Sequence, residues 1–333
     1  MKYYYNIFIV FLLTIRSLTG QNTCVDTYDS YYTKVNELEG KKEYEEAILL
    51  TNKVWNYFPE RKFELIKELE YLNKKTKKYK ENLLLWEEGH KEGYFFFLNK
   101  QMKQYESYLF YSEFDSLVVQ DNYIRDQVLK KSTTKHEVFL PFNYSSDQEY
   151  PLLIVLHGGG SNMEKSKIRW QLLDRLKSDF IVVYIQSYRH YDSKTFGWTS
   201  SDDRAHDDIE RIYFDLIENY SIDTSQIIIA GTSAGGTMAL DITFNETIPI
   251  TGIIVFCPGK PKNMKINSDF NKSIRVYMLA GQNDYYLPKQ EEIIKIFTSE
   301  HIDYLYKTIR GMGHEFPKQY DLIINDALNY LFD

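Results

Sequence analysis

The sequence has few cysteines, no cluster of positive charge and no long apolar run after its start. Its two cysteines, Cys24 and Cys257, are too few for a disulfide framework or a structural zinc site. The net charge is −7, from 40 basic and 47 acidic side chains, which argues against nucleic acid as the main partner. Beyond the first twenty residues, no apolar segment is long enough to span a membrane.

The composition is that of a folded protein. Hydrophobic residues make up 43% and charged residues 26% of the 333 residues, which excludes a wholly disordered chain. The length fits two domains or one large one. The 29 tyrosines are conspicuous, but they are spread along a chain rich in Lys, Asn and Ile. We attribute them to compositional drift rather than to a sugar-binding stripe.

Residues 1–20 have the order of a secretory signal peptide. Lys2 precedes a short apolar stretch at 7–15, and polar or small residues follow up to Gly20. The stretch is well short of the ~20 residues of a membrane-spanning helix. We expect cleavage after Gly20 and a secreted or periplasmic protein. An uncleaved anchor or a lipoprotein modified at Cys24 is the alternative.

Residues 25–110 have apolar side chains at helical spacing and few glycines. The pattern that starts at Tyr44 returns 35 residues later at Tyr79, close to the period of a tetratricopeptide repeat. We therefore expect an all-helical, tetratricopeptide-like segment, although an ordinary helical hairpin or bundle explains the pattern equally well. Two repeats bury little core, so this segment is expected to pack on its neighbour or on a protein partner.

After a linker at 111–132, residues 133–333 alternate between strand and helix patterns. The expected strands are 135–140, 152–156, 180–185, 226–230, 251–257, 275–279 and 304–309, and the expected helices are 207–219, 234–244, 289–298 and 320–331. This alternation predicts an α/β fold, with a mostly parallel sheet and helices on both faces. The small all-helical segment precedes it.

One predicted strand ends in a serine between glycines, in the order Gly231-Thr232-Ser233-Ala234-Gly235. A serine hydroxyl attacks a carbonyl only if it projects from a sharp turn. Neighbouring backbones lie close together in such a turn, so glycine is needed two positions before and after the serine. The motif predicts Ser233 as a nucleophile. A glycine-rich turn without catalysis is the alternative.

A second glycine-rich turn, His157-Gly158-Gly159-Gly160, follows the strand at 152–156. The backbone N–H groups of Gly158 and Gly159, with that of Ala234, would form a hole for the oxyanion of a tetrahedral intermediate. A phosphate-binding loop is the alternative, but no Gly-Lys-Ser/Thr follows. His157 is expected to shape this loop rather than to act as an acid or base.

A nucleophilic serine needs a base and a carboxylate that orients it. Of seven histidines, only His314 lies in a glycine-marked loop after a late strand. Asp284 lies in the loop after another apolar strand, whereas the rival Glu315 sits beside the base, where water would solvate it. The order Ser233, Asp284, His314 is that of the α/β-hydrolases. Asp208 is expected to cap a helix or brace the sheet.

Residues 133–333 resemble the small secreted esterases of the α/β-hydrolase superfamily, such as feruloyl and acetylxylan esterases and polyhydroxybutyrate depolymerase-like enzymes. The resemblance lies in Glu137-Val138-Phe139-Leu140-Pro141, Leu156-His157-Gly158-Gly159, Asp207-Asp208-Ile209, Asp223, Gly231-Thr232-Ser233-Ala234-Gly235-Gly236, Gly281, Asp284 and Gly313-His314. It implies ester hydrolysis through an acyl-serine intermediate, without a metal or other cofactor. The loop at 187–202 departs from the family pattern, so the substrate class transfers poorly.

The sequence also bears on the substrate. The connection from Pro258 to Ile274 is a loop rather than a lid domain, which predicts an open site for bulky or polysaccharide-linked esters. Tyr191 and Trp198 are candidates to border the acyl pocket, although core packing explains Trp198 equally well. A serine peptidase of the prolyl-oligopeptidase kind is one alternative, but its propeller has no counterpart in residues 25–110. A non-catalytic binding protein is the other, and it need not keep all three catalytic residue types.

Overall fold

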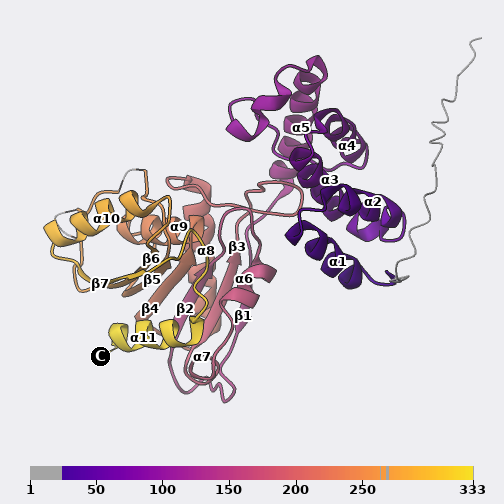
Figure 1. Cartoon of the computed structure of the whole chain (residues 1–333). Helices are drawn as coiled ribbons and strands as arrows, with labels where there is room; N and C mark the ends of the chain where they lie inside the picture. The colour runs from indigo at the N-terminus through magenta and orange to yellow at the C-terminus, as the bar shows by residue number, and fades with distance from the viewer. Residues whose placement is uncertain (1–24, 263, 268–269, 333) are drawn as a thin grey trace, which may run out of the picture. The chain divides into compact units, whose positions relative to one another are not determined.

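The chain folds into two compact units that meet in sequence between Lys78 and Tyr79 (Figure 1). The structure is a computed structural model, and it describes residues 25–262, 264–267 and 270–332. The predicted signal peptide lies outside these residues. The division between the two units falls inside the helical segment predicted at 25–110. The domain limits predicted from the sequence stay predictions.

The first unit is helical. It contains α1 (Tyr28–Gly40), α2 (Tyr44–Val54), the short η1 (Pro59–Arg61) and α3 (Lys62–Lys75). Helix α2 packs against both α1 and α3, and the buried Tyr31 hydroxyl lies 3.0 Å from Thr51 Oγ1 across the first pair. The helical character is as predicted. Tyr44 begins a helix, and so does Tyr79 in the second unit, but the tetratricopeptide likeness stays a prediction.

The second unit opens with three helical elements, α4 (Tyr79–Lys91), the short η2 (Lys103–Tyr108) and α5 (Ser112–Lys131). The segment predicted as a linker is thus one continuous helix of 20 residues. It buries few side chains, which is why its apolar periodicity is weak in the sequence.

A fully buried carboxylate holds this helical pair together. Asp121 of α5 accepts hydrogen bonds from the backbone N–H groups of Phe96 (2.6 Å) and Leu98 (2.8 Å). Its Oδ1 also lies 3.0 Å from Nε2 of His90, at the end of α4. A buried carboxylate is tolerated where such donors satisfy it, so Asp121 fixes the loop after α4 against α5.

The rest of the second unit is built on a seven-stranded sheet (Figure 1). Its strands are β1 (Lys135–Phe139), β2 (Tyr150–Leu156), β3 (Ile181–Gln186), β4 (Ile222–Thr232), β5 (Gly252–Phe256), β6 (Arg275–Gly281) and β7 (Asp303–Ile309). Their order is β1-β3-β2-β4-β5-β6-β7, with β1 antiparallel and all others parallel. The order changes direction between β2 and β4, the usual place for a ligand site in such sheets.

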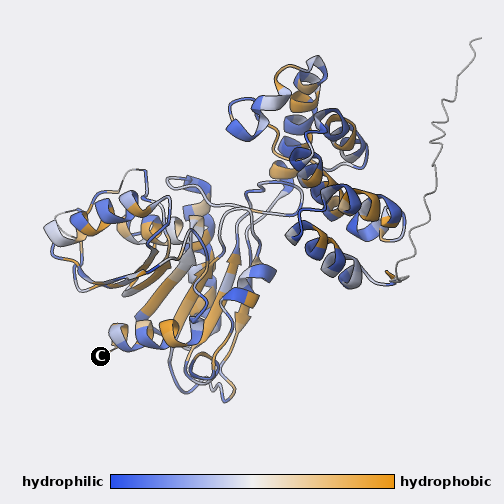
Figure 2. Ribbon diagram, viewed as in Figure 1, coloured by the Kyte–Doolittle hydropathy of each residue, from blue (hydrophilic) through white to orange (hydrophobic). Residues whose placement is uncertain are grey.

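Helices cover both faces of the sheet, and the strands between them are apolar (Figure 2). One face packs on α8 (Asp203–Asn219), α9 (Ala234–Phe244) and α10 (Leu287–Ser299), and the other on α6 (Met163–Arg169), α7 (Asp174–Asp179) and α11 (Tyr320–Phe332). Alternate side chains of β2 point to opposite faces: Ile154 joins the first core and Val155 the second. The predicted α/β fold, preceded in the sequence by an all-helical segment, is confirmed.

The observed elements differ from the predicted ones in detail. Helices α6 and α7 are absent from the prediction, since each is under eight residues long. The side chain that caps α8 is Asp202, not Asp208. Asp208 instead accepts a hydrogen bond from Thr134 Oγ1 (2.6 Å), next to β1, and so braces the sheet, the other role predicted for it. Among the described helices, none has both the length and the apolar character required to cross a membrane.

Replacing Asp121 with alanine should destabilise the second unit. The substitution removes the acceptor of the Phe96 and Leu98 N–H groups. The expected loss of unfolding free energy is roughly 2–4 kcal/mol. Urea denaturation followed by circular dichroism measures it. Asp126→Ala, an exposed acid on the same helix, is the matched control and should stay within about 0.5 kcal/mol of the wild type. Equal midpoints for Asp121→Ala and the wild type would contradict this account of Asp121.

Candidate active site

Ser233 stands on a strained turn between β4 and α9. Its backbone has φ 55° and ψ −120°, an unusual conformation for a residue with a side chain. A Cβ on Gly231 would lie 2.4 Å from the Gly235 carbonyl carbon, and one on Gly235 would lie 2.4 Å from the His157 oxygen. Only glycine fits at either position. The two glycines therefore allow the turn that presents Ser233, as the motif predicts.

His314 lies beside Ser233 and links it to Asp284. Its Nε2 is 2.7 Å from Ser233 Oγ, and its Nδ1 is 2.9 Å from Asp284 Oδ1. His314 follows β7 and Asp284 follows β6, and these strands pair along their whole length. The loop before His314 passes so close to β6 that a Cβ on Gly281 would lie 2.3 Å from the Gly313 oxygen. The structure thus brings together the three residues that the sequence singles out.

The Asp284 carboxylate is buried and well supplied with donors. The backbone N–H of Tyr286 donates to Oδ1 (2.8 Å), and Nε2 of Gln290 donates to Oδ2 (2.9 Å). Burial acts to raise the pKa of Asp284, but these hydrogen bonds act against it. A hydrogen bond from Cys257 and the charge of His314 act in the same direction, so the pKa of Asp284 lies below its ordinary value. Asp284 is therefore ionised at neutral pH.

Gln290 and Cys257 are two residues of the site that the sequence did not reveal. Gln290, on α10, is fully buried and also donates to the Pro258 carbonyl oxygen (3.1 Å). Burial, followed by contact with Asp284, raises the pKa of the Cys257 thiol to about 12, so it stays protonated. Gln290 lies inside a helix and Cys257 follows a buried strand, and no motif signals either one.

Among the described residues, one group of three potential metal ligands has its ligand atoms within 4.8 Å of one another. It consists of Cys257, Asp284 and His314. The aspartate and histidine atoms already bond to each other, and the thiol is protonated. The three side chains thus form a hydrogen-bonded network, in which the Asp284 and His314 atoms are already paired with each other.

The turn after β2 lies against the Ser233 turn. A Cβ on Gly159 would lie 3.3 Å from the Ala234 Cβ, and one on Gly158 would lie 3.4 Å from the Thr232 oxygen. Within the described residues, the N–H groups of Gly158, Gly159 and Ala234 donate no hydrogen bond to another protein atom. Three free donors thus lie next to the serine, and the positive end of α9 begins there.

His157 holds this turn as a neutral side chain. The backbone N–H of Ser187 donates to its Nε2 (3.2 Å), so the ring proton is on Nδ1, which donates to the Gly158 oxygen (2.8 Å). Burial lowers the pKa of His157 to about 4. The buried Trp198 ring packs on it at 5.3 Å between centroids. The structural role expected for His157 fits these contacts, and Trp198 is a core residue rather than a pocket wall.

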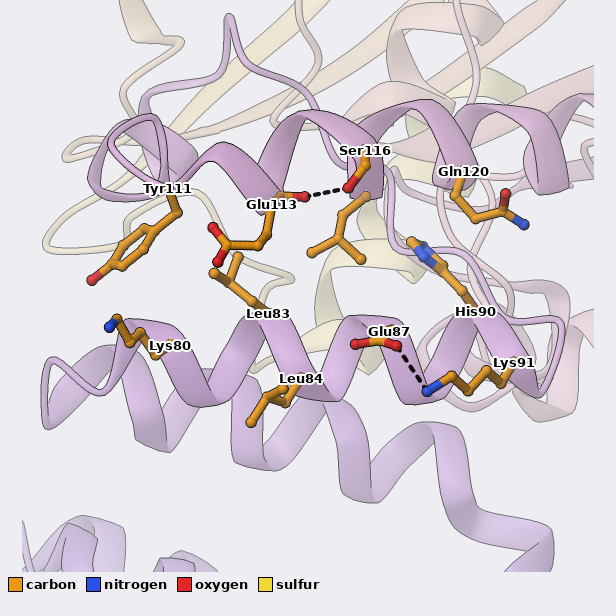
Figure 3. A pocket seen from close by; sticks show the side chains of 11 residues that line it. Lys80, Leu83, Leu84, Glu87, His90, Lys91, Tyr111, Glu113, Ser116 and Gln120 are labelled. Atoms are coloured by element: carbon orange, nitrogen blue, oxygen red, sulfur yellow. Dashed lines mark hydrogen bonds and ion pairs between the residues drawn. The ribbon is translucent and has the colours of Figure 1, made fainter. Parts of the chain in front are cut away.

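A separate groove of about 680 Å³ lies between α4 and α5 (Figure 3). Its lining includes the buried Leu83 and Leu117. Charged side chains such as Lys80 and Glu113 also line it (Figure 3). The groove contains none of the residues around Ser233. The protein partner expected for the helices stays a prediction.

Comparisons with known proteins agree with this fold. A family model described as BD-FAE matches residues 137–251, and the Phospholipase/Carboxylesterase model matches residues 196–331. A crystal structure of an uncharacterized protein from Bacillus cereus is similar over 92% of this chain and 99% of its own, at 18% identity and a TM-score of 0.50. The esterase PE8 structure covers 59% of this chain and 97% of its own, at 17% identity and a TM-score of 0.50. These structures share the fold.

The fold and the matched models define an α/β-hydrolase. Together the two models span residues 137–331, which include Ser233, Asp284 and His314. The two matches support an α/β-hydrolase of the esterase type, and the protein is a hydrolase. The resemblance inferred from the sequence motifs is confirmed at this level.

The buried neutral His157 should make stability depend on pH. Its pKa is about 4 when folded and about 6.5 when unfolded, so the unfolded chain takes up a proton first as the pH falls. The stabilisation is complete above about pH 6.5 and is lost down to about pH 4. Between pH 7.5 and 4.5, urea denaturation should show wild type losing about 2–3 kcal/mol more than His157→Gln. Equal losses in both proteins would refute the assignment of a neutral His157.

Proposed function

We propose that the protein is a serine esterase that hydrolyses carboxylic esters through an acyl-serine intermediate. The observation that carries the proposal is the hydrogen-bonded series Ser233–His314–Asp284, with its contacts of 2.7 and 2.9 Å. Nucleophile, base and orienting carboxylate stand in the order and at the distances that acyl transfer needs. No cofactor takes part in the proposed reaction.

The reaction begins when His314 Nε2 takes the proton of Ser233 Oγ and the oxygen attacks the ester carbonyl. Asp284 accepts from the Nδ1–H of His314, which leaves Nε2 free as the base and stabilises the imidazolium that forms. The N–H groups of Gly158, Gly159 and Ala234 stabilise the oxyanion. One such donor is worth on the order of 100–1,000-fold in turnover.

The second half of the reaction uses the same groups. His314 gives its proton to the leaving alcohol, and the acyl group remains on Ser233. Water then enters, His314 accepts a proton from it, and the hydroxide attacks the acyl-serine carbon. The tetrahedral intermediate collapses, Ser233 recovers its proton from His314, and the acid leaves.

We further propose that bulky esters, including polysaccharide-linked ones, reach the serine directly. The described part of the connection between β5 and β6 contains no helix, which supports an open site rather than a lid. The N-terminal leader pattern supports secretion or export to the periplasm. Hydrolysis rates distinguish this substrate class from that of a peptidase. They are compared between acetyl, feruloyl and short-chain acyl esters on one side and peptide p-nitroanilides on the other.

Ser233→Ala should abolish hydrolysis of p-nitrophenyl acetate, with a loss of roughly 10⁴-fold or more in kcat. His314→Ala should lose a similar factor, because the base and the nucleophile act as a unit. A fluorophosphonate probe, which reacts with activated serines, should label the wild type at Ser233 and should not label Ser233→Ala. Initial rates and peptide mass mapping are the two measurements.

Ser225→Ala, in the exposed part of β4, is the matched control and should keep the wild-type rate. Circular dichroism must show that each variant is folded. A folded Ser233→Ala protein with wild-type turnover would rule out Ser233 as the nucleophile. A wild type without turnover on any ester, and without labelling, would favour the binding-protein alternative.

A further inference from the structure

The groove between α4 and α5 is lined by one face of each helix (Figure 3). On α4 the lining residues recur once or twice in each helical turn from Lys80 to Lys91, and those of α5 do the same from Glu113 to Gln120. Side chains at this spacing lie on one side of a helix. The groove is therefore bounded by two helical faces that the sequence itself defines.

The lining combines apolar side chains with charges of both signs. Leu83, Leu84 and Leu117 supply the apolar part, and Leu84 is 66% exposed, so its surface is open to a ligand. The charged residues are two lysines and two glutamates, Lys80, Lys91, Glu87 and Glu113. Their formal charges cancel, so the lining favours an uncharged and largely apolar ligand.

His90 adds a buried polar atom to this lining. The side chain is only 8% exposed, and Nδ1 of its ring has no hydrogen-bond partner within the part of the chain that the structure describes. The other ring nitrogen, Nε2, lies 3.0 Å from Asp121 Oδ1. The ring cannot turn to pair Nδ1 without giving up the bond to Asp121. Because an unpaired buried polar atom is costly, Nδ1 marks a place where a ligand atom would be stabilising.

Asp121 determines which kind of ligand atom His90 can bind. A carboxylate only accepts hydrogen bonds, and Asp121 also accepts from the N–H groups of Phe96 and Leu98. Nε2 of His90 must therefore donate to Asp121. In the neutral ring, Nδ1 is then an acceptor, and its partner must be a donor such as a hydroxyl or N–H group. Figure 3 shows the His90 ring reaching from α4 toward α5.

We propose that the groove between α4 and α5 binds a small, uncharged, apolar molecule with one hydroxyl or N–H group that donates to Nδ1 of His90. The volume of about 680 Å³ is in the range of sites for small organic ligands, roughly 300–1,000 Å³. Leu83 and His90 lie seven residues apart on α4, about 10 Å along the helix axis. A molecule of this length packs on the leucines and reaches His90 at once. The site does not depend on the proposed esterase function.

The test compares two probes of about this length that differ only in the donor. 4-Propylphenol carries a hydroxyl group, and 4-propylanisole carries a methoxy group in its place. Both are titrated into the full chain at pH 8 and followed by calorimetry. 4-Propylphenol should bind with a Kd roughly 5- to 10-fold lower, because only its hydroxyl pairs the buried Nδ1. Equal Kd values for the two probes, or no binding of either, would overturn the proposal.

Three variants place the bound probe. Leu84→Glu introduces a charge at an exposed position of the groove and should weaken both probes several-fold. Val119→Glu is the matched control, since Val119 is 70% exposed on α5 but does not line the groove, and it should leave both Kd values unchanged. Ser233→Ala should also bind 4-propylphenol as the wild type does. Unchanged binding in Leu84→Glu, or loss of binding in Ser233→Ala, contradicts the proposed site.

His90→Gln tests the hydrogen bond itself. The glutamine amide keeps a donor for Asp121 but offers no counterpart of Nδ1, so the two probes should bind equally to this variant. Nitrogen-15 spectra of labelled histidine give a second measurement on the wild type. The Nδ1 signal of His90, identified by its loss in His90→Gln, should shift with 4-propylphenol and not with 4-propylanisole. A preference for 4-propylphenol that persists in folded His90→Gln refutes the role of Nδ1. If His90→Gln does not fold, the wild type and Leu84→Glu decide the question.

Discussion

Close backbone packing between the turns after β2 and β4 determines the geometry of the site. The Gly235 Cα passes the His157 oxygen at a distance that leaves no space for a side chain. The proposed nucleophile and oxyanion donors are therefore positioned by main-chain atoms of two adjacent strands, paired where Leu156 meets Gly231. Both strands are buried on two faces, so their ends have little freedom to move apart.

The acid and the base depend on a different set of elements. Asp284 receives hydrogen bonds from the start of α10 and from the turn after β5, and it accepts one more from His314 in the loop after β7. Each donor lowers the free energy of the carboxylate relative to the acid form. The ionised Asp284 in turn fixes the tautomer of His314, so a change at Gln290 on α10 reaches the serine through three hydrogen bonds.

Residues with a local pattern were predictable from the sequence. Ser233, Asp284 and His314 follow apolar strands and stand in turn motifs, and the structure brings all three together. Gln290 lies in the first turn of α10 with no motif around it, and α6 and α7 are too short for a period to show. The bond from Phe95 to Ser193 joins residues 98 positions apart, beyond the range of any periodicity.

The backbone of Ser233 has an evolutionary consequence. A positive φ at a residue with a Cβ costs of order 1–3 kcal/mol, whereas glycine adopts it almost freely. The most stable version of this fold is therefore one with no nucleophile at position 233. Under the proposed mechanism, selection for turnover keeps serine there, and a lineage released from that selection would be expected to lose the hydroxyl well before it loses the sheet.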